Sequence, residues 1–146
     1  MTPHELLAQD SVVFALARAW RDSDPGLVTA HEEGGFVIWD AQGVLRVERW
    51  PRGDNNSIVI PLHDDCRFGE TDIVATFHTH PNLGSDFLQE PSATDRRAVR
   101  NDPNLKSRSY VGEFVIANDV TYLVSPDGEV SIVGRTSDIL DVGQGD

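Results

Sequence analysis

Two histidines that lie one residue apart, His78 and His80, are the residues of this sequence best suited to chemistry. They follow an apolar run at residues 73–77, which predicts a buried strand. Because alternate side chains of a strand point to the same side, both imidazole rings can reach a single target. Neutral imidazole is a good ligand for divalent transition metals, and zinc accepts nitrogen and oxygen donors in tetrahedral geometry. The pair therefore predicts a metal site at the end of this strand.

A serine and an aspartate in Ser-x-x-Asp spacing, Ser92 and Asp95, follow the histidines. This spacing is typical of a helix start, with Ser92 as the N-cap and Asp95 near the positive end of the helix dipole. A helix capped in this way holds both side chains on one side of its first turn, where Asp95 can be a third metal ligand. Three protein ligands and one open position are typical of a catalytic zinc site. The alternative interpretation is that the two histidines are structural or lie on the surface by chance, and that Ser92 and Asp95 only cap the helix.

His-x-His, a loop and then Ser-x-x-Asp resembles the motif of the JAMM (JAB1/MPN/Mov34) metalloprotease family, and its wording here is similar to that of short bacterial members. The family also has a glutamate upstream, in Glu-x-x-Gly before an apolar run. Glu32 lies three residues before Gly35 and matches that glutamate, with Glu33 as the near alternative. One departure is the loop. Eleven residues, 81–91, separate the second histidine from the serine, where the family usually has about seven.

The resemblance implies a zinc-dependent hydrolase. It implies Zn2+ held by His78, His80 and Asp95, with Glu32 as the general base that takes a proton from water. It also implies that Ser92 donates a hydrogen bond to the developing oxyanion. The bond cut would be an amide, peptide or isopeptide, in a protein or peptide substrate. A ubiquitin-like protein with an extended C-terminal tail is the first candidate, which would make the activity deubiquitinase-like.

Two other functions stay open at this stage. A JAMM-like fold can act as a binding module without turnover, and short bacterial members include toxin-type and phage-type metallopeptidases with other substrates. Two further classes that use His-x-His are disfavoured by counting. Cupins place a glutamate roughly three to five residues after the motif, whereas Glu90 comes ten residues after His80. Amidohydrolase barrels need about 200 residues or more.

The composition indicates an ordinary globular protein of one domain, residues 1–146. The net charge of −12 makes a phosphate backbone an unfavourable partner, so nucleic acid is not expected. No apolar run reaches the roughly 18 residues of a membrane span, and the N-terminus has no signal-peptide pattern.

The single cysteine, Cys66, permits no internal disulfide and is predicted to lie in a loop. The expected compartment is the cytoplasm, with leaderless secretion as the alternative, and the sequence sets no oligomeric state.

The site is expected in an α/β fold whose mixed, largely antiparallel sheet is flanked by helices, as in JAMM/MPN proteins. Helical spacing and a Thr2 cap predict a first helix that ends by Arg21, and Ser92 opens a second helix. Turn signals and apolar runs predict strands at residues 36–39, 44–50, 58–61, 73–77, 110–117, 122–124 and 130–133. The acidic tail, residues 136–146, is expected to be loose.

Two further stretches have two interpretations each. The loop at residues 81–91 contains Phe87 and Leu88, which are expected to pack into the core, with a lid over the cleft as the alternative. Five basic residues lie between Arg96 and Arg108. They are expected to form a solvated face, with a rim for an acidic partner as the alternative.

Overall fold

The computed structural model describes residues 1–141, which form a mixed α/β fold around one sheet. The strands are β1 (Gly34–Trp39), β2 (Leu45–Arg49), β3 (Arg67–Phe68), β4 (Thr71–Thr79), β5 (Glu113–Ile116), β6 (Val120–Val124) and β7 (Val130–Arg135). The helices are α1 (Pro3–Leu7), α2 (Asp10–Asp22), α3 (Ala93–Arg100) and α4 (Thr136–Ile139), with a 3₁₀ turn, η1, at Pro103–Leu105.

The strands lie in the order β2-β1-β4-β5-β6-β7, and the short β3 pairs with β4. Among the described strands, β4 and β5 are parallel and the other paired strands are antiparallel. The predicted mixed, largely antiparallel sheet between helices is therefore confirmed.

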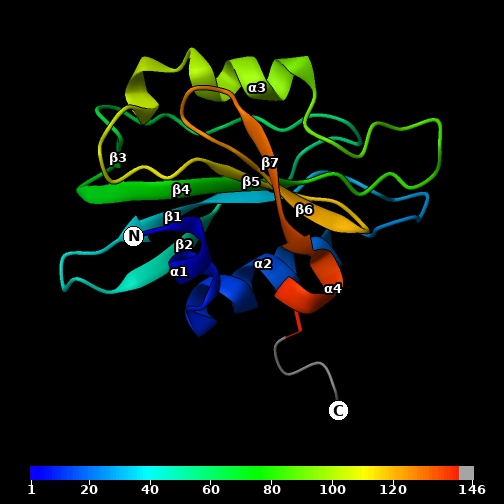
Figure 1. The fold of residues 1–146 in the computed structure, drawn as a ribbon, viewed down its shortest axis with the longest axis horizontal. Helices are drawn as coiled ribbons and strands as arrows, with labels where there is room; N and C mark the ends of the chain where they lie inside the picture. Colours follow the sequence, from blue (N-terminus) through cyan, green and yellow to red (C-terminus); the bar gives the residue numbers. More distant parts are fainter. Residues whose placement is uncertain (142–146) are drawn as a thin grey trace.

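Helices cover both faces of this sheet (Figure 1). On the face covered by α1, α2 and α4, Leu16 and Phe77 belong to one buried apolar cluster. On the face covered by α3, Val99 packs with Phe36 and Trp50 in a second cluster. Burial of each large apolar side chain contributes about 1.5–3 kcal/mol, so the two clusters together hold the central strands in place.

The central strand β4 brings four segments of the chain together. Residues 73–79 of β4 are buried. β1 runs antiparallel to it, with Gly34 opposite His78, so the segment before β1 lies beside the end of β4. The chain then crosses through α3 to β5, which runs parallel to β4. The end of β4, the start of α3, the start of β5 and the segment before β1 therefore meet in one region.

Three predicted elements differ from the structure. The first helix is two helices, because Gln9 has an extended backbone between α1 and α2. Residues 58–61 form no strand. Ile58 and Ile60 instead pack against the second apolar cluster, which explains their alternating pattern without strand pairing. β3 lies inside the predicted polar loop and forms a short hairpin with the start of β4.

The prediction of a loose tail is wrong for its first part. α4 begins at Thr136, which is buried and donates a hydrogen bond from Oγ1 to the carbonyl oxygen of Ala117 at 2.7 Å. Leu140 is 4% exposed and belongs to the first apolar cluster. The acidic composition of this stretch predicts an exposed tail, so it gives no sign that Thr136 and Leu140 are buried. Residues 142–146, the rest of that prediction, lie outside the described residues.

Candidate metal centre

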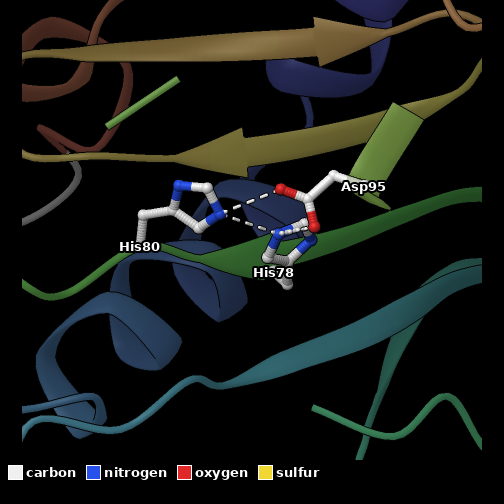
Figure 2. Close-up of side chains that lie close together, drawn as sticks. All are labelled: His78, His80 and Asp95. Atoms are coloured by element: carbon white, nitrogen blue, oxygen red, sulfur yellow. Dashed lines mark hydrogen bonds and ion pairs between the residues drawn. The ribbon is translucent and has the colours of Figure 1, made fainter. Parts of the chain in front are cut away.

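His78, at the end of β4, His80, just after it, and Asp95, in the first turn of α3, point toward one another (Figure 2). The Nε2 atoms of the two histidines are 3.2 Å apart. Asp95 Oδ1 lies 3.5 Å from Nε2 of His78, and Asp95 Oδ2 lies 3.2 Å from Nε2 of His80. Ligand atoms bound at about 2.0–2.1 Å to a tetrahedral zinc are about 3.3 Å from one another. The group therefore has the spacing of three zinc ligands.

The other ring nitrogens of the two histidines are held by hydrogen bonds. His80 Nδ1 lies 3.1 Å from the carbonyl oxygen of Gln89, and a carbonyl only accepts, so this nitrogen carries a proton. His78 Nδ1 lies 2.5 Å from a carboxylate oxygen of Glu113. In neutral rings, both Nε2 atoms therefore turn lone pairs toward each other and toward Asp95. This arrangement favours a positive charge among the three groups.

The electrostatic surroundings of His78 favour a positive charge as well. Burial by itself lowers the pKa of His78, but the carboxylates of Glu113 and Asp95 outweigh it and raise that pKa well above its ordinary value. A proton on His78 supplies one positive charge beside these carboxylates, and a bound divalent cation would supply two. Two imidazoles and one carboxylate are a donor set that suits zinc. The residues present thus fit the predicted ion.

Ser92 and Asp95 form the predicted helix cap. Ser92 Oγ accepts a hydrogen bond from the backbone N–H of Asp95 at 3.0 Å, and Asp95 Oδ2 accepts one from the backbone N–H of Ser92 at 2.8 Å. Burial alone would raise the pKa of Asp95, but the neighbouring rings of His78 and His80 and the backbone N–H of Ser92 hold that pKa well below its usual range. The cap therefore fixes an ionised carboxylate beside both histidines.

Glu32 precedes β1 and lies on the same side of the sheet as the histidines. Since Gly34 pairs with His78, continuing the antiparallel register sets Glu32 opposite His80. The backbone of Glu32 is held by the 53–54 loop: its N–H donates to Asp54 at 2.8 Å and its carbonyl accepts from Gly53 at 2.9 Å. The side chain is buried, and this burial raises its pKa above the ordinary value.

Glu33 lies on the opposite side of the chain from Glu32. Its carboxylate is 2.6 Å from Nε2 of His31 and 2.5 Å from the guanidinium of Arg49. Its backbone carbonyl accepts from the backbone N–H of Thr79 at 2.9 Å, as the continued register requires, and its backbone N–H donates to the side-chain Oγ1 of Thr79 at 3.0 Å. Strand alternation thus separates the two candidate glutamates: Glu32 lines the cleft, and Glu33 is an ion-pair partner outside it.

A cleft with a volume of about 480 Å³ contains all five residues predicted for the site. Its walls also include two apolar side chains from the 81–91 loop, Phe87 and Leu88. These are 45% and 54% exposed, so the expectation that they pack into the core is wrong and they lie at the cleft instead. The five basic residues between Arg96 and Arg108 are exposed, as expected for a solvated face, and none of them lines this cleft.

Two residues of the site were not predicted from sequence. Glu113 is 4% exposed and contacts His78 from the start of β5. Its signal is a charged residue in an otherwise apolar strand, but the strand pattern does not say which strand lies beside it. Gln89 contributes a backbone carbonyl to His80, and its side-chain amide donates to the carbonyl of Asn82 at 2.7 Å, which closes the 81–91 loop on itself.

No known protein-family model, curated protein or solved structure matches this chain. Within residues 1–141, none of the helices has the length and apolar character that crossing a membrane requires.

Proposed function

We propose that this chain is a zinc-dependent peptidase or isopeptidase with a JAMM/MPN-type fold and site. The supporting observation is the convergence of His78, His80 and Asp95 at zinc-ligand spacing in a cleft that Glu32 and Ser92 also line. The chain order of these elements also agrees with the family pattern: a glutamate before a strand, two histidines at a strand end, and a capped helix.

The catalytic roles follow from the chemistry of the lining groups. When bound here, zinc supplies a Lewis acid that lowers the pKa of water from about 15.7 to about 7 and polarises a carbonyl. The Glu32 carboxylate takes a proton from the attacking water while the water oxygen bonds to the carbonyl carbon. Glu32 then gives this proton to the leaving amine nitrogen as the C–N bond breaks.

Ser92 is suited to stabilise the negative charge that develops on the carbonyl oxygen. Its Oγ accepts from the backbone N–H of Asp95, which leaves its own O–H to donate into the cleft. In other hydrolases, loss of one such donor lowers kcat by about 10²–10³. The cap already holds this hydroxyl in place, so donation needs little rearrangement.

An extended protein segment is the proposed substrate. Ile58, Ile60, Phe87 and Leu88 give the cleft apolar walls, while its charged lining is acidic apart from the histidines. Such a cleft suits a chain with apolar or basic side chains near the scissile amide. The C-terminal tail of a ubiquitin-like protein is the first candidate, joined through a peptide or isopeptide bond. We place the activity in the cytoplasm as part of this proposal.

The test is cleavage of a panel of Lys-linked and linear ubiquitin-type conjugates, with unrelated extended peptides beside them. We expect cleavage that stops after zinc is removed by a chelator and returns when zinc is added. The Glu32→Gln variant, which keeps the three ligands, serves as the inactive control. Cleavage of unrelated peptides alone would replace the ubiquitin-like substrate with a general one. Zinc binding without cleavage of any substrate would contradict the peptidase and favour a binding module.

A further inference from the structure

We propose that Glu113 is a positioning residue that fixes the ring of His78 for metal binding; this inference rests on the metal site of the proposed function. Glu113 opens β5, which runs parallel to β4, and lies opposite Thr76 in the register. One of its carboxylate oxygens is 2.5 Å from Nδ1 of His78. The contact brings a carboxylate from a different strand onto the metal-binding histidine.

The second carboxylate oxygen of Glu113 also has a buried hydrogen-bond partner. Thr76 donates from Oγ1 to this oxygen at 2.8 Å. Since the hydroxyl proton of Thr76 is used in that bond, its oxygen accepts from the hydroxyl of Tyr110 at 2.7 Å. The hydroxyl of Thr76 and the ring N–H of His78 therefore both point toward the carboxylate, and Glu113 cannot rotate without breaking these two buried hydrogen bonds. The orientation of the His78 ring is set from inside the protein.

A carboxylate at this position does more than fill a hydrogen-bonding need. A neutral acceptor would satisfy the N–H of His78 without the cost of burying a charge. A carboxylate beside a ligand histidine fixes the tautomer with the proton on Nδ1, leaves Nε2 for the metal and increases the basicity of the ring. His80, in contrast, is held by the neutral backbone carbonyl of Gln89. The two histidines are therefore oriented by different means, and His78 is the one held by a charge.

The first test is zinc affinity, measured by competition with a chromophoric chelator. We expect Glu113→Gln to bind zinc about 10- to 100-fold more weakly than the unchanged protein. Glu33→Gln is the matched control, because Glu33 is also a buried carboxylate on a histidine nitrogen, His31, but lies outside the cleft. Its zinc affinity should stay within about twofold of the unchanged protein.

The second test is the ring N–H signal of His78 in NMR spectra of the zinc-loaded protein. We expect a low-field Nδ1–H resonance, which moves upfield in Glu113→Gln. Tyr110→Phe keeps the carboxylate and removes only the outermost hydroxyl, so it should fold even if Glu113→Gln does not. It should shift the same resonance by a smaller amount.

The outcomes separate this inference from the function on which it rests. If the unchanged protein binds no metal, the metal site and the proposed function fail together with the role of Glu113. If that protein binds zinc, but the affinity of Glu113→Gln is unchanged and the His78 resonance does not move, only the role of Glu113 is overturned. With Tyr110→Phe as the sole folded variant, an unmoved resonance would have the same meaning.

Discussion

Replacement of Glu32 by glutamine separates the general base from the metal ligands. Glutamine has the shape of glutamate but cannot take a proton from water. A general base contributes typically 10²–10⁴-fold to turnover, which corresponds to about 3–5 kcal/mol in the activation barrier. The side chain of Glu32 is 6% exposed and lines the cleft, so bulk water has little access to replace it. We expect turnover to fall by at least about a hundredfold.

The same substitution should leave the fold and the metal content intact. Burial raises the pKa of Glu32, which means that folding favours its neutral form over its ionised form. At pH 7, above the ordinary pKa of a glutamate, removing this charge should therefore not lower the free energy of unfolding. Zinc analysis, thermal unfolding and steady-state turnover of Glu32→Gln check the three expectations together. A variant that loses zinc would show that Glu32 acts on the ligands and not as a base.

Glu33→Gln is the neighbouring control in the same assay. Glu33 is the near alternative to Glu32 in sequence, and in the structure its carboxylate makes buried contacts with His31 and Arg49. Loss of its charge should lower the free energy of unfolding by about 1–3 kcal/mol while turnover below the unfolding temperature changes little. If Glu33→Gln abolishes turnover and Glu32→Gln does not, the register that sets Glu32 beside His80 is wrong.

Three other predictions concern the cleft wall, the cysteine and the tail. Phe87→Ala and Leu88→Ala should raise KM for an extended substrate and leave zinc content unchanged; a lower zinc content would show that the loop supports the ligands instead. Cys66 is 2% exposed, and burial raises the pKa of its thiol. At pH 8 the thiol should therefore react with a thiol reagent only after unfolding in guanidinium. Rapid reaction of the native protein would contradict its burial. Leu140→Ala should lower the free energy of unfolding by about 2–5 kcal/mol in denaturant titrations, whereas an unchanged midpoint would mean that the end of α4 adds nothing to the core.

The parts of the site that depend on local pattern could be predicted from sequence. An apolar run ending in His-x-His predicts a buried strand with both rings on one side, and Ser92 and Asp95 carry their own capping signal. These signals act over a few residues, so they need no knowledge of the neighbouring strands. The choice between Glu32 and Glu33 is different, because it depends on pairing between β1 and β4. The Glu-x-x-Gly spacing favours Glu32, and the register places this acid on the cleft side.

The parts that depend on packing between distant segments could not be predicted. Glu113 reaches His78 because β5 runs parallel to β4, a pairing between strands that are separated by a long crossover. The alternation of Ile58 and Ile60 predicts a strand, yet it arises from packing against the second apolar cluster. Phe87 is a large apolar residue of the kind usually found in a core, yet it is exposed in a loop that the Gln89–Asn82 hydrogen bond closes on itself.

The zinc content of the purified protein tests the central claim most directly. Elemental analysis should find close to one zinc per chain in the unchanged protein, as expected for one three-ligand site. The double variant with His78→Ala and His80→Ala should contain essentially none, because it removes two of the three ligands and leaves only Asp95. Thermal unfolding of both proteins without metal controls for loss of fold. Full zinc retention by the double variant would contradict the assignment of this site.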